Sequence, residues 1–391
     1  MNKELLDFAA RLRERFFVGD DVRSLILQNQ QSAIGNRQLL EPRHLGSYEN
    51  DFNSFALELF ALQLKFNPAY RKICAGRKLM PGAVEYWTEI PVVPTAIFKE
   101  LELTSIPPTE RTAVFHSSGT TEQKPSWHFH CAESLAFYEA SLWPWFVRHV
   151  VPEFGVRSSE FGVLILSPPP AQASHSSLVH MFETIRQKLG APESTFVGQI
   201  DAMSGWTLDF DATLMALNST LDTRHSTLLL GTAFSFVHLL DYLAEKNLSF
   251  RLPPGSRVME TGGYKGRSRS MPKAELHALI TERLGVPPEN IICEYGMSEL
   301  SSQAYDTSCL APHTPRLFRF PPWARVQVIS PETGCEVADG ETGLIRIFDL
   351  ANVFSVMAIQ TEDVGIRREN GFELIGRAQS AEPRGCSLMT V

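Results

Sequence analysis

Residues 161–166 read Phe-Gly-Val-Leu-Ile-Leu, a short apolar run that ends just before three consecutive prolines beginning at Pro168. Such a run, bounded by turn residues, predicts a buried β-strand. Apolar side chains then recur at the spacing of a helix, at Val179, Phe182 and Ile185. The stretch therefore predicts a strand, a loop and a helix in succession.

The same unit recurs further along the chain. Apolar strands are expected at 227–230, 257–261 and 291–295, with a turn at Gly231 and helices at 235–245 and after Pro272. Strands that alternate with helices predict an α/β fold, in which a mostly parallel sheet is covered by helices on both faces. Because ligands bind at the carboxyl ends of such strands, the loops that follow them are the candidate site.

The two ends of the chain follow other patterns. Residues 1–100 carry helical spacings, including a first helix with Leu5, Ala9, Leu12 and Phe16 on one face. After residue 321 the pattern changes to alternating strands at 324–329, 344–348 and 363–368, which predict a small antiparallel β-subdomain.

Composition excludes several classes of protein. The chain has 391 residues, 43% of them hydrophobic, and a net charge of −8. These values indicate a globular protein that does not attract nucleic acid through its overall charge. Six cysteines without a CxxC pair predict free thiols, and neither zinc nor a disulfide is expected. An N-terminus with early acidic residues and no long apolar stretch predicts a cytoplasmic protein without a membrane span.

The most informative polar stretch is 114–125. Four hydroxyl residues surround a glycine there, and a lysine follows: Ser117, Ser118, Gly119, Thr120, Thr121 and Lys124. Glycine lets the backbone approach phosphate oxygens, hydroxyls donate hydrogen bonds to them and lysine neutralises their charge. A polyphosphate-binding loop and an ordinary polar surface turn both fit these residues.

A second cluster, Tyr295-Gly-Met-Ser-Glu299, follows an apolar strand. The carboxylate of Glu299 is a suitable Mg²⁺ ligand, the hydroxyl of Ser298 can bond a phosphate oxygen and the ring of Tyr295 can stack on a base. Each residue alone is more often structural.

Taken together and in order, these motifs resemble the adenylate-forming ligases. The set comprises Ser-Ser-Gly-Thr-Thr with its lysine, Tyr-Gly-Met-Ser-Glu, the acidic Thr-Glu-Asp at 361–363 and Gly376-Arg377. Within that superfamily, the stretches 90–99, 261–265, 295–303 and 376–388 resemble the LuxE-type acyl-protein synthetases. The resemblance runs from about Ile90 to the C-terminus.

The resemblance implies a role for each motif residue. The residues 117–121 would wrap the triphosphate of ATP, Ser298 would contact the α-phosphate and Glu299 would hold Mg²⁺. The nucleotide would be bound further by Tyr295, Gly296, Asp363, Arg377, Gly262 and Gly263. The implied organisation is a helical entry segment (1–100), an α/β nucleotide-binding core (101–320) and a β-subdomain with a tail that carries Cys386 (321–391).

Two features depart from the common pattern of adenylate-forming ligases. Glu122 stands where glycine is usual, and the chain ends at Val391, so we expect the C-terminal lid domain to be absent or vestigial. The lid's catalytic lysine then has no counterpart, and Lys124 and Lys265 are the candidates for its role. The acyl-protein synthetases share the truncation.

Three functions stay open at this stage. In the first, a fatty or related carboxylic acid becomes an acyl-adenylate, then a thioester on Cys386, and passes to an acyl-CoA-reductase-like partner. A lone cysteine is more often a small buried residue, and it is the resemblance that favours Cys386 as the acyl acceptor. In the second, a ligase resembling phenylacetate-CoA ligase uses CoA or a hydroxyl acceptor. In the third, a non-catalytic subunit binds the acyl chain and the reductase. The oligomeric state is not indicated.

Overall fold

The structure is a computed structural model that describes residues 2–17, 45–77, 81–117, 124–151, 161–191, 194–201, 205–223, 225–263, 268–307, 316–369 and 371–378. Its α-helices are α1 (Lys3–Phe16), α3 (Leu45–Phe66), α4 (Pro68–Gly76), α5 (Ala132–Val150), α6 (Ser177–Leu189), α7 (Phe210–Thr223), α8 (Ala233–Glu245) and α9 (Lys273–Leu284). Short 3-10 helices lie at Pro81–Ala83, Trp87–Glu89, Thr95–Lys99, Pro108–Glu110 and Pro288–Asn290.

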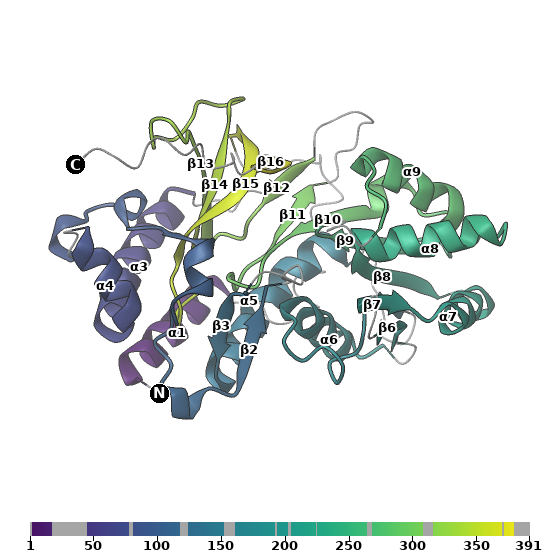
Figure 1. Cartoon of the computed structure of the whole chain (residues 1–391), viewed down its shortest axis with the longest axis horizontal. Helices are drawn as coiled ribbons and strands as arrows, with labels where there is room; N and C mark the ends of the chain where they lie inside the picture. Colours follow the sequence, from purple (N-terminus) through teal and green to yellow (C-terminus); the bar gives the residue numbers. More distant parts are fainter. Residues whose placement is uncertain are drawn as a thin grey trace.

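The strands fall into one large sheet and two hairpins (Figure 1). The strands of the large sheet are β1 (Val93–Pro94), β4 (Phe161–Leu166), β5 (Ser194–Phe196), β8 (Ser226–Thr232), β9 (Arg257–Thr261), β10 (Ile291–Tyr295), β11 (Ala304–Thr307), β12 (Leu317–Arg319), β13 (Ala324–Ile329), β14 (Thr342–Asp349), β15 (Ala358–Arg368) and β16 (Gly371–Arg377). The hairpins are β2 (Ala113–His116) with β3 (Trp127–His130), and β6 (Gly198–Asp201) with β7 (Gly205–Leu208).

The large sheet has a parallel half and an antiparallel half. Its order is β13-β14-β15-β16-β12-β11-β10-β9-β8-β4-β5, with β1 paired to β15. From β10 to β5 every pair is parallel. From β10 to β13 every pair along this order is antiparallel, and β1 pairs parallel with β15. The β-strands expected after residue 321 therefore extend the central sheet rather than forming a sheet of their own. Strand β10 lies where the two halves meet.

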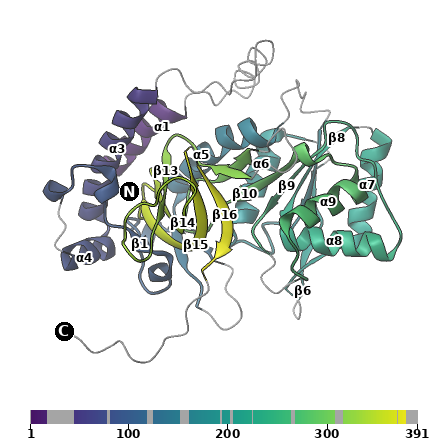
Figure 2. The same cartoon turned by 90° about the horizontal axis from the view of Figure 1, so that it is seen from above.

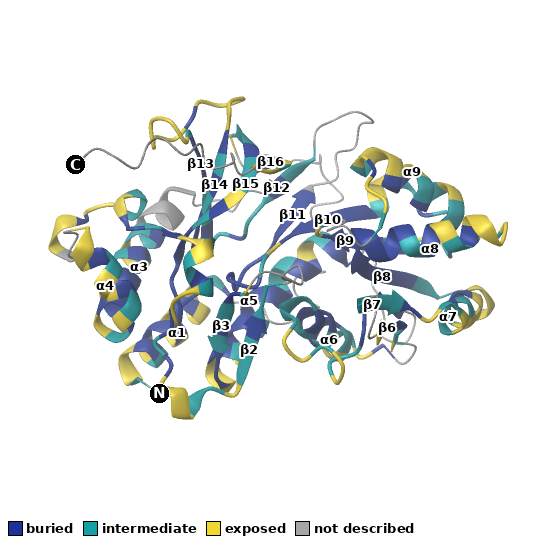
Figure 3. Cartoon of the chain, viewed as in Figure 1, coloured by how far each residue is buried: buried dark blue, intermediate teal, exposed yellow. Residues whose placement is uncertain are grey.

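Helices cover the parallel half on both faces, as expected. Leu229 and Val258 pack with α8 and α9 on one face, whereas Leu228 and Met259 pack with α5 and α6 on the other. Figure 1 shows α8 and α9 on one side of the strands and α6 on the opposite side. Side chains of a strand alternate between faces, so these strands are apolar throughout because both faces are buried. Figure 3 shows them as the buried centre of the molecule.

The N-terminal helices pack on the antiparallel half (Figure 2). Helix α1 buries Leu5, Ala9 and Leu12 as the sequence predicts, together with Phe8. These side chains belong to one apolar core that also contains Ile345 of β14 and other residues of the antiparallel strands. Residues from both ends of the chain thus share a core.

The strand predictions are confirmed and one turn prediction is wrong. β4 and β9 have the predicted bounds, but Gly231 lies inside β8 instead of in a turn. A Cβ on Gly231 would meet Leu166 Cβ at 3.0 Å and Phe236 Cε2 at 3.1 Å, so glycine serves close packing of the strand on its neighbours. Helix α8 begins directly after Thr232, whose side chain accepts a hydrogen bond from the amide of Ser235.

Across the described ranges, no helix combines the length and apolar character needed to cross a membrane.

Candidate active site

The residues 295–299 leave β10 at its carboxyl end, where the parallel and antiparallel halves of the sheet meet. Gly296 allows close packing at this point, because a Cβ there would come closer than 3.0 Å to the carboxylate of Glu294 unless that side chain moved. The neighbouring parallel strand β9 ends at Thr261, which pairs with Glu294 in the sheet. Gly262 and Gly263 follow it, and a Cβ on either would meet no atom of the described residues within 4 Å. Two neighbouring strands are thus followed directly by glycines at the same edge of the sheet.

Tyr295 connects this segment to the antiparallel strands. Its hydroxyl donates to Asp363 Oδ2 at 2.8 Å, and Arg377 Nε lies 3.6 Å from Asp363 Oδ1. Asp363 and Arg377 are directly opposite each other on β15 and β16. Burial and the neighbouring Asp363 carboxylate raise the pKa of Tyr295 well above its usual value, so the hydroxyl stays a neutral donor. Three of the predicted nucleotide-binding residues therefore form one cluster.

The ring of Tyr295 is 6% exposed and meets phenylalanines edge-on. Its centroid lies 5.3 Å from that of Phe372 and 6.2 Å from those of Phe318 and Phe320. These contacts hold the hydroxyl in place beneath Asp363. Stacking of this ring on adenine stays a prediction.

Glu299 lies at the other end of the segment and is 5% exposed. Ser126 Oγ donates to Glu299 Oε1 at 2.6 Å, and Ser298 Oγ donates to Glu299 Oε2 at 3.0 Å. The amide of Ser126 in turn donates to Ser117 Oγ at 3.0 Å. The first residue of the hydroxyl-rich stretch is thus joined to Glu299 through a single intervening residue.

Two histidines of the β2–β3 hairpin hold this arrangement. His128 Nδ1 lies 2.6 Å from the carbonyl oxygen of Ser298, and His116 Nδ1 lies 3.1 Å from that of Ser126. A carbonyl only accepts, so each Nδ1 carries the proton. Burial lowers the pKa of His128 to about 4, which keeps its imidazole neutral near pH 7. The hairpin is therefore fastened to the segment after β10.

Lys124, the predicted phosphate-binding lysine, contacts an acidic and an aromatic side chain in this structure. Its Nζ lies 3.6 Å from Glu100 Oε2 and 4.9 Å from the centroid of the Trp127 ring. The remaining predicted residues lie outside the described residues: Ser118, Gly119, Thr120, Thr121, Glu122, Lys265 and Cys386.

Sequence reasoning missed a buried polar network behind the segment. Asp349 accepts hydrogen bonds from the amide of Ser301 at 2.9 Å and from Ser302 Oγ at 2.7 Å. Asn352 Nδ2 donates to the carbonyl oxygen of Glu299 at 2.9 Å. Burial raises the pKa of Asp349 to about 6, although these donors oppose the rise. The available signal was the presence of polar residues in an otherwise apolar run, 349–359.

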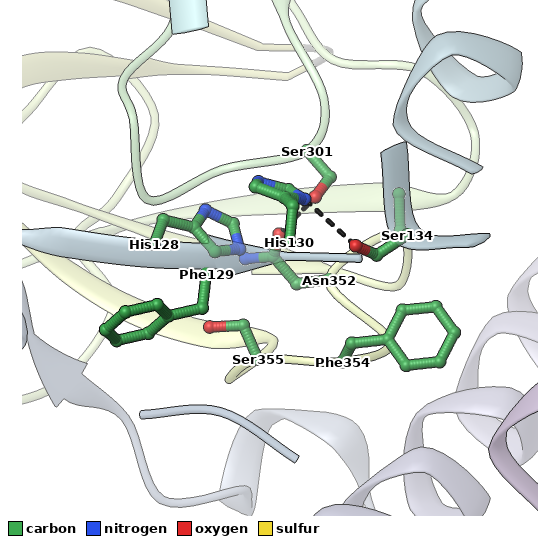
Figure 4. Close-up of a pocket in the computed structure, with 9 residues that line it drawn as sticks. His128, Phe129, His130, Ser134, Ser301, Asn352, Phe354 and Ser355 are labelled. Atoms are coloured by element: carbon green, nitrogen blue, oxygen red, sulfur yellow. Dashed lines mark hydrogen bonds between the residues drawn. The ribbon is translucent and has the colours of Figure 1, made fainter. Parts of the chain in front are cut away.

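A small cavity lies in this network (Figure 4). It has a volume of about 10 Å³ and is lined by His128, Phe129, His130, Ser134, Ser301, Ala351, Asn352, Phe354 and Ser355. His130 Nδ1 contacts Ser134 Oγ at 3.1 Å, whereas its buried Nε2 has no hydrogen-bond partner among the residues that the structure describes. The volume suits one water molecule and is far too small for a nucleotide. The cavity is therefore part of the polar network behind residues 295–299 and not a binding site for the nucleotide.

The fold is that of an adenylate-forming ligase. The solved structure of 2-hydroxyisobutyryl-CoA ligase in an open conformation, in complex with 2-HIB-AMP and CoA, matches with a TM-score of 0.61 at 14% identity, over 88% of this chain and 75% of that one. ATP-bound MatB from Rhodopseudomonas palustris matches with a TM-score of 0.46 at 18% identity, over 70% of this chain, which spans about half (49%) of that structure.

The chain belongs to the family of acyl-protein synthetases, LuxE, whose pattern matches residues 41–390. Two curated relatives are both described as long-chain-fatty-acid–luciferin-component ligase. The protein from Aliivibrio fischeri is 24% identical over 345 residues, covering 85% of each chain. The protein from Vibrio harveyi is 23% identical over 378 residues, covering 94% of this chain and 92% of the relative. The protein is thus a ligase of the AMP-forming, acyl-protein synthetase type.

Proposed function

We propose that this protein activates a fatty acid, or a related carboxylic acid, with MgATP and then transfers the acyl group to a protein thiol. In the first step a carboxylate oxygen bonds to the α-phosphorus while the bond from that phosphorus to the bridging oxygen breaks, so that pyrophosphate leaves. No general base is needed, because the attacking carboxylate is already ionised. Catalysis then consists of positioning and of neutralising the charge that develops on phosphate oxygens.

The contact between Ser126 and Glu299 carries this proposal. It brings the start of the hydroxyl-rich stretch, at Ser117, next to a buried carboxylate that can hold Mg²⁺. Residues 117–121 would hold the triphosphate, Ser298 the α-phosphate and Glu299 the metal. The hydrogen bond from Ser126 would fix the orientation of the Glu299 carboxylate before the nucleotide and Mg²⁺ bind.

The nucleoside would lie at the other end of the same segment. Asp363 would accept hydrogen bonds from the ribose hydroxyls, and Tyr295 and Arg377 would hold its carboxylate in place. Gly262 and Gly263 would leave room for the nucleotide or the acyl group. Lys124 would have to leave Glu100 to reach a phosphate, which its half-exposed side chain permits.

In the second step the thiolate of Cys386 would attack the carbonyl carbon of the acyl-adenylate, and AMP would leave. The thioester would then pass to an acyl-CoA-reductase-like partner. Family membership supports this order of events, and Cys386 follows the β-subdomain directly in the chain. The domain division at residues 100 and 320 stays part of this proposal.

Exchange of labelled pyrophosphate into ATP tests the first step. We expect acid-dependent exchange with the full chain, at least a hundredfold reduced in Glu299→Gln because the metal loses its charged ligand. Glu332→Gln is the control, since that glutamate is exposed in a turn. No exchange with any chain length of acid, or unchanged exchange in Glu299→Gln, would contradict the proposal.

The acceptor is tested separately. Cys386→Ser should retain pyrophosphate exchange but lose the hydroxylamine-labile acyl label, while Cys335→Ser, which removes an exposed thiol, should keep both. A label that survives in Cys386→Ser means another acceptor. Acyl-CoA formed on addition of CoA would favour a CoA ligase, and absence of MgATP binding in calorimetry would favour a non-catalytic subunit.

A further inference from the structure

Three buried donor atoms converge beneath the carboxyl ends of β9 and β10. Cys293 Sγ lies 2.8 Å from Glu260 Oε1 and 3.7 Å from His277 Nε2, and that nitrogen lies 3.3 Å from Glu260 Oε1. The side chains are 3%, 0% and 5% exposed. In the part of the chain that the structure describes, these are the His, Cys, Asp and Glu side chains that form a potential metal-binding group.

The sheet register explains why they meet. Cys293 and Glu260 are directly opposite each other on parallel strands β10 and β9. They lie on the same face as Ile291 and Val258, which pack against α9 together with α8. Helix α9 carries His277 on its buried side. The three side chains thus come from three elements that pack in one core.

The arrangement differs from that of a catalytic thiol. In a Cys-His-carboxylate triad the histidine uses one ring nitrogen toward the thiol and the other toward the carboxylate. Here a single nitrogen, His277 Nε2, faces both Cys293 and Glu260. The three ligand atoms lie within 4.8 Å of one another, an arrangement that suits a shared metal ion better than a proton relay.

We propose that Glu260, His277 and Cys293 bind a divalent transition-metal ion of the zinc type. Thiolate, imidazole and carboxylate are the ligands that zinc takes in proteins, and metals bound mainly by oxygen, such as magnesium, would not select a thiolate. Tetrahedral bonds of zinc place sulfur and nitrogen about 3.6 Å apart and nitrogen and oxygen about 3.3 Å apart. The observed separations are 3.7 and 3.3 Å.

The sulfur-to-oxygen distance is the one that must change. At 2.8 Å it is a hydrogen bond from the Cys293 thiol to Glu260, whereas about 3.6 Å is expected around zinc. Metal binding releases the thiol proton to solvent and forms the S–metal bond in place of the S–H bond. The opening of less than about 1 Å is within reach of a carboxylate rotation.

Lys273 competes with the metal for the same carboxylate. Its Nζ lies 2.7 Å from Glu260 Oε1 and 3.1 Å from the carbonyl oxygen of Gly262. The lysine side chain is 40% exposed, so it can turn to solvent when a metal takes its place. Through Gly262 it joins the buried cluster to the strand end where the nucleotide is proposed to bind. A bound ion would therefore brace β9, β10 and α9, which support that edge.

The full chain, treated with chelator and dialysed, is titrated with Zn²⁺ and with Co²⁺. We expect about one ion per chain, a rise in Tm on addition of Zn²⁺ and, with Co²⁺, a thiolate-to-metal charge-transfer absorption. Cys293→Ser should lose the charge-transfer band and most of the affinity. Cys131→Ser is the matched control: it removes another buried thiol, at a helix N-cap where serine is well tolerated.

Lys273→Gln separates a metal site from a closed hydrogen-bonded network. If a metal binds, removing the competing cation should raise its affinity roughly tenfold, and Zn²⁺ should restore any Tm that the variant loses. No binding to the wild-type chain, equal binding to Cys293→Ser, or a Lys273→Gln variant that zinc does not stabilise would overturn the proposal. These readouts do not involve ligase activity, so they stand apart from the proposed function.

Discussion

The hydroxyl of Tyr295 donates a hydrogen bond to Asp363, joining the strand at the centre of the sheet, β10, to β15 in its antiparallel half. The two residues are 68 positions apart in the chain. Their contact places an acidic side chain over the carboxyl end of a parallel strand, which is where ligands bind in α/β sheets.

Tyr295→Phe removes that hydrogen bond and keeps the ring among its phenylalanine neighbours. We expect the KM for ATP to rise about tenfold, because Asp363 is no longer held for the ribose, with a loss of about 2 kcal/mol in the free energy of unfolding. Steady-state kinetics and urea unfolding measure the two effects. Tyr86→Phe changes an exposed tyrosine and serves as the control. An unchanged KM would remove Tyr295 from the nucleotide site.

Ser126→Ala leaves Glu299 with Ser298 as its side-chain donor. The carboxylate then loses its fixed orientation, so the Mg²⁺ concentration for half-maximal pyrophosphate exchange should rise by roughly tenfold. Ser270→Ala, an exposed position, should behave as wild type. If both variants show the same Mg²⁺ dependence, Ser126 does not position a metal ligand.

Glu294 should make stability depend on pH. Burial raises its pKa to about 7, with the carboxylate of Glu260 adding to the rise while the hydrogen bond from Thr261 opposes it. Between its unfolded pKa, about 4.3, and about 7, the folded protein holds a proton that the unfolded chain releases. The free energy of unfolding therefore falls as pH rises through this window.

Glu294→Gln should remove this contribution. Urea unfolding at several pH values between 5 and 8 should show the variant gaining stability relative to wild type as pH rises, by an amount on the order of 2 kcal/mol. Asp349 also has a raised pKa, but it is present in both proteins and its effect cancels. A difference that stays constant with pH would mean that Glu294 titrates normally.

Gly296→Ala should destabilise the fold, because the added Cβ would collide with the carboxylate of Glu294. A cost of about 1–3 kcal/mol is expected, as for overpacking elsewhere. The double variant Glu294→Ala/Gly296→Ala should recover part of this cost, and a double-mutant cycle on urea unfolding measures the coupling. Additive effects would show that the glycine serves another purpose.

Local sequence patterns were sufficient for several individual elements of this fold. The apolar runs at 161–166 and 257–261 are strands with the predicted bounds, and α1 buries the predicted face. The reason is that burial on both faces of a parallel sheet demands continuous apolar residues, whereas burial on one side of a helix demands a spacing of three and four. The turn predicted at Gly231 is wrong, because this glycine lies within a strand. Its small size is required by close packing against Leu166, which is distant in the chain.

The candidate site likewise contains residues that local patterns indicate and contacts that they do not. The residues 295–299 could be singled out because a polar cluster directly follows an apolar strand, and the motif order pointed to the superfamily. The hydrogen bond from Ser126 to Glu299 spans 173 positions, and no local pattern indicates it. The same reason applies to the polar network of Asp349 and Asn352, because its partners Ser301 and Glu299 lie in the distant connection between β10 and β11.

Cys293 shows most clearly which contacts cannot be predicted from the sequence. The cysteine spacing does not indicate that Cys293, His277 and Glu260 meet, because 16 and 17 positions separate them in the chain. By itself the sequence determined which segments become strands and helices, because that depends on the polarity of near neighbours along the chain. Only the tertiary structure decided which side chains meet, because strand pairing and helix packing bring together residues whose separation in the chain carries no signal.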